Sequence, residues 1–402
     1  MTPSTSCREL MDFEIDREYV LEVLTQMVRT DSRNPGLVED GPGEEEIAAL
    51  IAGYLSDLGL STTVHRMAPN RVNVLGVLAG EGGGRTLMLN GHTDTVGVEG
   101  MEDPFSAAVR EGKLYGRGAQ DMKGSLAAML GALKALVDGG IRLRGSLLFA
   151  AVADEEDRSL GTRHLIQRYT ADGAVVTEPT DMEVVIAHRG MLWYEVETLG
   201  RAAHGSRYQD GIDAITQMGR FLKELDRLQQ DLLEREPHPL VGCPSLHASV
   251  IEGGTDWSTY PAGCRLRLER RSIPGETPAE VTAELQKIIT ALSVQDPDFN
   301  ARLRQLLVRR PLETNPESGL VRSLQGAFSE KLNRSPELTG AAYWSDAALL
   351  EEAGMEAVLL GPVGGGLHGQ EEWVELSSVY ELAGVLAAAA AAYCGAAARP
   401  GK

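Results

Sequence analysis

The stretch "TLMLNGHTDTV" at positions 86–96 combines an apolar run, as in a core strand, with a histidine and an aspartate directly after it. A second stretch, "SLLFAAVADEED" at 146–157, ends its apolar run in acids. Carboxylates are costly to bury unless they are paired or bound to metal. Since sites in α/β sheets form beyond the carboxyl ends of strands, we expect His92, Asp94, Glu155 and Glu156 to meet at one sheet edge.

Helical patterns alternate with apolar strands on both sides of these stretches, which predicts an α/β fold with a largely parallel sheet. The same alternation of helices and apolar strands resumes after Pro311. The predicted helices are 15–30, 42–60, 121–140, 161–169, 317–333, 345–353 and an alanine-rich helix within 384–398, and the predicted strands are 72–80, 85–92, 144–156, 172–179 and 355–362.

The middle of the chain has a different pattern, with alternating strands and two long helices in the order β-α-β-β-α-β. This order is typical of a small α+β, ferredoxin-like layer. Its predicted strands are 190–200, 245–254, 264–273 and 299–310, and its helices are 213–235 and 277–293. We therefore predict one domain inserted into another, with 1–187 and 310–402 forming the outer domain and 188–309 the inserted one.

Composition and charge exclude several classes of partner. The 402-residue chain has a net charge of −20, so its surface repels nucleic acid and anionic lipid, and we expect neither as a partner. The acidic N-terminal segment lacks the apolar core of a signal peptide, and the alanine-rich run near the C-terminus is a poor membrane span. No C-x-x-C motif is present, and four separated thiols fit a reducing compartment. The four cysteines are Cys7, Cys243, Cys264 and Cys394. From these features we predict a cytoplasmic protein.

Three further residues join the candidate site. Asp121 opens a helix in "YGRGAQDMKGS", Glu178 follows a strand, and His368 lies in the glycine-rich "GPVGGGLHGQEEW". Two histidines and several carboxylates are a typical ligand set for zinc, with cobalt or manganese as alternatives. One carboxylate can bridge two ions about 3.5 Å apart, and such a pair lowers the pKa of a shared water. Of the neighbours Glu155 and Glu156, one would bind metal and the other act as base.

Other interpretations of these motifs remain open at this point. A single His-x-Asp is usually a structural hydrogen bond, and a run of acids is usually a solvated turn, but their joint occurrence at strand ends favours a metal site. "GRGAQDMKG" resembles a nucleotide-binding loop, yet Asp121 stands where the third glycine would be, and no phosphate-binding P-loop motif is present. A Rossmann-type oxidoreductase is therefore disfavoured.

Five motifs resemble those of the M20 metallopeptidase family in order and approximate spacing. They are "GHTDTV", "GRGAQDMKGS", "ADEE", "TEPT" and "LHGQEEW", and the resemblance extends over nearly the whole chain. This family includes acetylornithine deacetylase, succinyl-diaminopimelate desuccinylase, aminoacylase-1 and glutamate carboxypeptidase. The resemblance implies a di-metal hydrolase domain with an inserted lid and dimerisation domain.

The resemblance also implies a role for each motif residue. Glu155 would be the general base that deprotonates the shared water and then protonates the leaving amine. Asp94 would fix the ring of a metal-binding histidine. One zinc ion would be held by His92, Asp121 and Glu178, and the second by Asp121, Glu156 and His368.

Residues around the inserted domain are implied to contact substrate. His204 in "GRAAHGS" would stabilise the oxyanion, in many relatives from the partner subunit, so a homodimer is implied. Arg271 in "RRSIPGE" would bind a substrate carboxylate, and the amides of Gly364 and Gly365 could assist. The alternative for His204 is a surface histidine, and the alternative for Arg271 is an arginine that forms a salt bridge at the end of a strand. Ser258 stands where many relatives have an asparagine that helps to bind the carboxylate of the substrate. Serine is shorter and has no amide donor, so we expect this chain to bind the substrate carboxylate differently.

The sequence thus predicts a di-zinc amidohydrolase that cleaves the amide bond of a small N-acyl amino acid, with acetylornithine deacetylase-like activity. Metal-activated hydroxide would attack the carbonyl while Glu155 moves the proton. A metallo-dipeptidase or carboxypeptidase acting on short peptides is the alternative within the same chemistry. A catalytically silent homologue that binds metal and ligand is the alternative of another class.

Overall fold

The computed structural model describes residues 13–397, which form two compact units. The first unit contains the described residues up to Ile186, then Thr314–Thr339 and the described residues from Ser345 onward; the second contains Ala187–Glu313 and Gly340–Trp344. The sequence placed the edges of the inserted domain near 187 and 310. The short return at Gly340–Trp344 lies with the second unit, where the indole N–H of Trp344 donates to the carbonyl of Arg310 at 3.1 Å.

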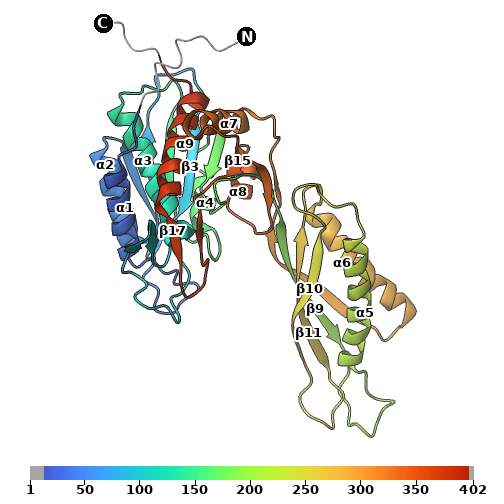
Figure 1. The fold of residues 1–402 in the computed structure, drawn as a ribbon. Coiled ribbons are helices and arrows are strands. Elements are labelled where there is room, and N and C mark those ends of the chain that lie inside the picture. The colour runs from blue at the N-terminus through green and yellow to red at the C-terminus, as the bar shows by residue number, and fades with distance from the viewer. Residues whose placement is uncertain (1–12, 398–402) are drawn as a thin grey trace. The chain divides into compact units, whose positions relative to one another are not determined.

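A mixed nine-stranded sheet runs through the first unit (Figure 1), and its last strand, β13, consists of residues grouped with the second unit. Its strand order is β1-β2-β6-β3-β7-β15-β8-β13, with β14 beside β8. The α/β class is confirmed: the central strands β6, β3, β7 and β15 pair in parallel, whereas the pairs β1–β2, β2–β6, β15–β8 and β8–β13 are antiparallel. The strands are β1 (Ser61–Ala68), β2 (Arg71–Leu78), β3 (Leu87–His92), β6 (Leu147–Val152), β7 (Gly173–Val176), β8 (Val184–His188), β13 (Leu312–Glu313), β14 (Leu338–Ala341) and β15 (Glu356–Leu359).

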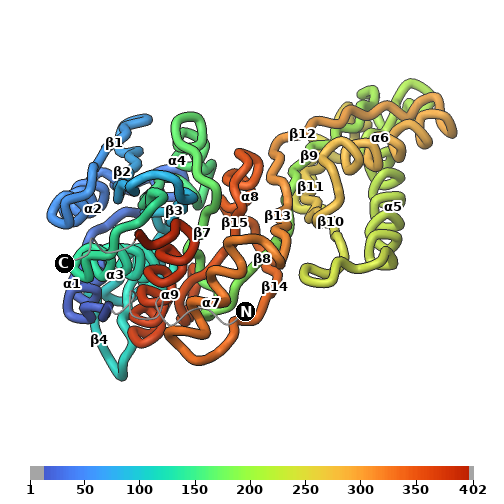
Figure 2. Tube along the Cα trace, turned by 90° about the horizontal axis from the view of Figure 1, so that it is seen from above, coloured from blue at the N-terminus to red at the C-terminus, as the bar shows by residue number. Residues whose placement is uncertain are grey.

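Helices cover both faces of this sheet. In Figure 2, α3, α7 and α9 lie on one side of the central strands, and α4 and α8 lie on the other. Strands β3, β6 and β7 are buried along their whole length because both of their faces are covered. The helices are α1 (Arg17–Arg29), α2 (Glu45–Asp57), α3 (Gly124–Asp138), α4 (Leu160–Leu165), α7 (Gly319–Leu332), α8 (Ala347–Glu352) and α9 (Leu376–Cys394).

The alanine-rich C-terminal helix α9 is a core element. By length and composition it could span a membrane, but 78% of its most apolar window is buried inside the protein, where it packs against α3 and α7. It begins at Leu376 and ends at Cys394, so the predicted range of 384–398 was displaced toward the C-terminus. The cytoplasmic location stays a prediction.

The second unit has the predicted ferredoxin-like topology. Its antiparallel sheet runs in the order β10-β11-β9-β12, and both helices pack against it. A capping box between Thr277 and Glu280 begins α6, as Thr followed by Pro predicts. The elements are β9 (Gly190–Leu199), α5 (Ala214–Leu233), β10 (Ser245–Gly253), β11 (Gly263–Ser272), α6 (Pro278–Gln295) and β12 (Ala301–Arg309).

A small third sheet was not predicted from the sequence. It joins β4 (Ala108–Arg110), β5 (Lys113–Tyr115), β16 (Gly364–Gly365) and β17 (Trp373–Glu375) in the order β16-β17-β5-β4. Because β17 pairs with β5, the segment after Tyr115 lies beside the segment before Trp373. The thiols of Cys243, Cys264 and Cys394 are free, and only the first is not fully buried; Cys7 lies outside the described residues.

Candidate metal centre

Three parallel strands bring the candidate residues to one edge of the sheet. His92 ends β3 and lies in register with Val152, the last residue of β6. Asn90 of β3 is in register with Val176 of β7. Because the chain continues from β6 into the acids and from β7 to Glu178, all three strand ends contribute polar side chains at the same place.

Asp121 lies between the two histidines. Its Oδ1 is 2.8 Å from Nε2 of His92, and its Oδ2 is 3.4 Å from Nε2 of His368. Nε2 of His368 is also 3.3 Å from Oε1 of Glu156, and Nε2 of His92 is 3.9 Å from Oε2 of Glu178. Each oxygen of one carboxylate therefore faces a different imidazole, as a bridging ligand requires.

Two overlapping groups of side chains have the spacing of a metal site. One contains His92, Asp121 and Glu156, and the other contains His92, Glu155 and Glu178; within each group, the ligand atoms lie within 4.8 Å of one another. The two acids that follow β6 thus extend toward different groups. Both groups could hold a cation.

The three glutamates of this cluster are poorly compensated by protein charges, whereas hydrogen bonds from the two histidines lower the pKa of Asp121 despite its burial. Burial, together with neighbouring acids, raises the pKa of Glu178 to about 8, and burial followed by repulsion from Glu178 raises the pKa of Glu155. Hydrogen bonds to Asp121 and Glu156 raise the pKa of His368 to about 10. Cations placed among these groups would stabilise the ionised carboxylates.

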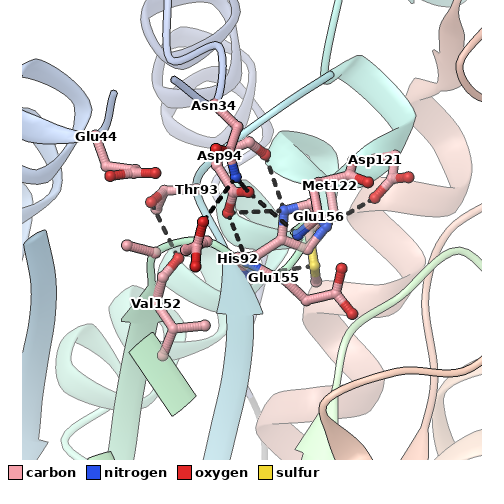
Figure 3. A network of polar contacts seen from close by, with 12 residues as sticks. Asn34, Glu44, His92, Thr93, Asp94, Asp121, Met122, Val152, Glu155 and Glu156 are labelled. Carbon is pink, nitrogen blue, oxygen red and sulfur yellow. Dashed lines mark hydrogen bonds and ion pairs between the residues drawn. The ribbon is translucent and has the colours of Figure 1, made fainter. Parts of the chain in front are cut away.

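Asp94 connects the first histidine to the acids of the second motif (Figure 3). Nδ1 of His92 lies 2.9 Å from the main-chain carbonyl oxygen of Asp94 and 3.7 Å from its carboxylate. The carboxylate accepts the backbone N–H groups of Glu155 at 3.1 Å and Glu156 at 3.2 Å. Asp94 therefore positions the ring through its main chain and the turn of acids through its side chain.

A buried polar network, which no sequence motif predicts, lies behind Asp94. Nδ2 of Asn34 donates to Asp94 at 2.8 Å and to Asp154 at 3.1 Å. Nη2 of Arg71 lies 2.9 Å from Oδ1 of Asp154, and its Nη1 pairs with Glu44. These groups are almost fully buried, so the network fixes Asp94 from the side away from the histidines.

The predicted residues of the second unit form two separate features. His204 and Ser258 lie on adjacent exposed loops, where the N–H of Gly205 donates to the carbonyl of Ser258 at 2.6 Å. Arg271 is engaged elsewhere: its Nε lies 2.6 Å from Oε1 of Glu269.

The predicted glycine amides belong to the first unit and lie in a strand. Gly364 and Gly365 form β16, which pairs with Val374 and Trp373 of β17. The turn that follows begins at Gly366, whose φ of 79° lies in the left-handed region, and it leads to His368.

Comparison with known proteins agrees with this architecture. The profile described as "Peptidase family M20/M25/M40" matches residues 88–392. The chain is 31% identical over 391 residues to the acetylornithine deacetylase of Myxococcus xanthus, covering 92% of this chain and 97% of that one. It is 30% identical over 369 residues to the N-formyl-4-amino-5-aminomethyl-2-methylpyrimidine deformylase of Bacillus subtilis, covering 84% and 86%.

Among solved structures, aminopeptidase PepT from Bacillus cereus has a similar fold. The TM-score is 0.78 at 19% identity, with 94% of this chain and 99% of that chain covered. At this identity the likeness concerns the fold alone. The family resemblance that the five sequence motifs indicated is confirmed by the profile and by the relatives. The chain belongs to peptidase family M20/M25/M40, whose members are hydrolases that act on amide bonds.

Proposed function

We propose that this protein is a di-metal amidohydrolase that removes the acyl group from a small N-acyl amino acid, as an acetylornithine deacetylase does. The observation that carries the proposal is the position of Asp121, whose two carboxylate oxygens lie 2.8 and 3.4 Å from the two histidines. The relative from Myxococcus xanthus, named for this activity, supports the choice of substrate class.

The donor atoms fit two divalent cations. Oε1 of Glu178 is buried and lacks a hydrogen-bond partner within residues 13–397. Burial raises the pKa of this carboxyl to about 8, and a bound cation would stabilise its ionised form. Carboxylate and imidazole donors suit zinc, and cobalt or manganese would suit them as well. In this assignment His92, Asp121 and Glu178 hold one ion, and Asp121, Glu156 and His368 hold the other.

When bound, the ions would polarise the scissile carbonyl and lower the pKa of a water molecule. The protein's own contribution to proton transfer is Glu155. Its carboxylate takes a proton from the attacking water and delivers it to the nitrogen of the departing amine. The hydrogen bond from its backbone N–H to Asp94, at 3.1 Å, orients Glu155 for this transfer.

Substrate binding would involve the second unit. We assign oxyanion stabilisation to His204, with Ser258 on the neighbouring loop contacting the substrate. Arg271 would bind a substrate carboxylate only by sharing its guanidinium with Glu269, because that ion pair already occupies Nε. Gly364 and Gly365 would approach the substrate through their backbone.

We further propose that two copies associate through the second unit. Strand β10 lies at the edge of its sheet, and the side chains of Val250 and Ile251 on it are 42% and 53% exposed. An apolar edge strand is a template for pairing with another chain. Analytical ultracentrifugation would test this: a dimer that Ile251→Lys dissociates supports it, and a monomeric wild-type protein contradicts it.

The experiment that tests the catalytic proposal is hydrolysis of a panel by protein loaded with zinc. The panel contains N-acetylornithine, other N-acyl amino acids and dipeptides, so it also tests the alternative of short-peptide hydrolysis. Glu155→Gln removes the proton carrier and should lower kcat by about 10²–10⁴-fold while both ions stay bound.

Glu371→Gln is the matched control because Glu371 is exposed on the His368 loop, and its kcat should equal that of the wild type. Turnover of N-acyl amino acids that depends on Glu155 supports the proposal. Preference for dipeptides would favour the peptidase alternative. Two bound ions without turnover on either class would favour a silent homologue.

A further inference from the structure

A buried ion pair between Arg117 and Glu372 lies behind the metal centre. Nη1 of Arg117 is 2.6 Å from Oε2 of Glu372, and the two side chains are only 3% and 1% exposed. Neither residue is a candidate metal ligand, and the proposed mechanism does not use them. Removing two charges from water costs free energy, so we expect a buried pair in this position to have a structural or functional role.

The carboxylate of Glu372 accepts hydrogen bonds from three backbone N–H groups in the segment that leads to Asp121. Its Oε2 accepts the N–H of Gly118 at 3.0 Å, and its Oε1 accepts the N–H groups of Gln120 at 2.9 Å and Asp121 at 3.0 Å. Gly118 has a φ of 79°, which glycine adopts without strain. The proposed bridging ligand is therefore held by a carboxylate located 251 residues further along the chain.

Arg117 connects the same carboxylate to two other loops of the centre. Its Nε donates to the carbonyl of Gly97 at 2.8 Å, and its Nη2 donates to the carbonyl of Gly369 at 2.9 Å. Gly97 follows the motif that contains His92, and Gly369 follows His368 directly. One guanidinium thus contacts the loops of both histidines.

The two proposed ion sites depend on these loops to different degrees. His92 ends strand β3, and Glu178 lies two residues beyond strand β7, so the sheet itself positions them. Asp121 lies in the short helical turn Ala119–Lys123, where its own φ of −117° and ψ of 90° are not helical. His368 lies on the loop after β16, and its side chain is 53% exposed. The first ion site thus has two ligands at strand ends, His92 and Glu178, whereas all three ligands of the second site, Asp121, Glu156 and His368, lie on turns or loops away from the strand ends.

From these contacts we infer that Arg117 and Glu372 are a positioning pair that sets the separation of Asp121 and His368, and so the affinity of the second ion site. This inference rests on the proposed ligand assignment. Loss of the pair should weaken the second ion more than the first, because two of its ligands would lose their fixed separation. Residues that orient metal ligands in this way commonly change metal affinity by about 10–100-fold.

The test is stepwise zinc binding by equilibrium dialysis against a competing chelator, with wild-type protein, Glu372→Gln and the milder Arg117→Lys. Glu356→Gln is the matched control. That carboxylate also accepts a backbone N–H, from Leu320 at 3.0 Å, but Glu356 is the first residue of β15 and so lies at the amino ends of the parallel strands, opposite to the ends that carry the ligands. Thermal unfolding of the metal-free proteins checks that each variant is folded.

The expected result is that the first ion binds Glu372→Gln within about threefold of wild type, whereas the second is weakened by about 10–100-fold. Arg117→Lys should show a smaller loss at the same step, and Glu356→Gln should show none. Wild-type affinity for both ions in Glu372→Gln would overturn the inference, as would equal weakening at both steps. Fewer than two ions on the wild-type protein would instead refute the ligand assignment, and the inference with it.

Discussion

Replacing Asp94 by asparagine tests how the two motifs are joined. Oδ2 of Asp94 accepts two donors, the amide of Asn34 at 2.8 Å and the N–H of Glu156 at 3.2 Å, whereas Oδ1 accepts only the N–H of Glu155 at 3.1 Å. The amide oxygen of Asp94→Asn will therefore take the place of Oδ2. Its NH₂ group will then face the N–H of Glu155, which loses its acceptor.

The magnitude follows from that single contact. A hydrogen bond to a charged group contributes about 1.5–3 kcal/mol, so the free energy of unfolding should fall by about that amount. A shift of about 1 Å in the carboxylate of Glu155 should lower kcat by about 10²-fold, while KM changes little. Urea unfolding and steady-state hydrolysis of the preferred N-acyl amino acid measure the two effects.

The control is Asp213→Asn in the second unit. Asp213 caps helix α5 by accepting the N–H of Thr216 at 2.9 Å, and asparagine caps helices about as well as aspartate. Both quantities should stay at wild-type values in this variant. If Asp94→Asn retains kcat within threefold of wild type, the carboxylate of Asp94 does not position Glu155, and our reasoning about this turn is wrong.

Three further predictions concern the metal, a loop and pH. Chelation should abolish hydrolysis and added zinc, cobalt or manganese should restore it; activity that survives chelation would contradict a metal mechanism. Gly118→Ala should lower the free energy of unfolding by about 1–2 kcal/mol or more, because φ is 79° and the new Cβ would lie 2.7 Å from Cγ2 of Thr95; an unchanged urea midpoint would refute this. Burial lowers the pKa of His188 to about 4, below its value in the unfolded chain, so stability should fall as the pH drops from about 6.5 toward 4. His188→Gln should reduce that dependence in urea unfolding at several pH values, and an identical slope would count against it.

The sequence predicted the elements and the residues whose positions follow from local pattern. Apolar runs marked the central strands, and His92 and Glu178 follow two of those strands by at most two residues. Parallel strands end at the same edge of a sheet, so their convergence could be expected. The two helices of the second unit were likewise predicted from their sequence pattern, the second of them with Thr277 as its cap.

Long-range polar contacts could not be predicted in this way. Asn34 reaches Asp94 across 60 residues and Asp154 across 120, and no spacing rule connects these positions. The same holds for Glu372, whose motif suggested only the neighbouring His368 as a ligand. Strand β1 was missed because most of its side chains are partly or fully exposed, and so it lacks an apolar face.

The prediction for Asp94 itself shows where sequence reasoning reaches its limit. The motif suggested that its carboxylate orients the ring of His92. In the structure the main-chain carbonyl of Asp94 lies 2.9 Å from that ring, and the carboxylate lies 3.7 Å from it while it accepts two backbone N–H groups. The residue type was evident, but its contacts depend on how the turn after β6 folds against it.

The most direct test of the central claim is the location of metal in crystals of zinc-loaded protein, by anomalous diffraction at the zinc absorption edge. Our account predicts two peaks, one on each side of Asp121, with the first in contact with His92 and the second in contact with His368. A single peak that contacts neither histidine, or no peak at this edge of the sheet, would contradict it.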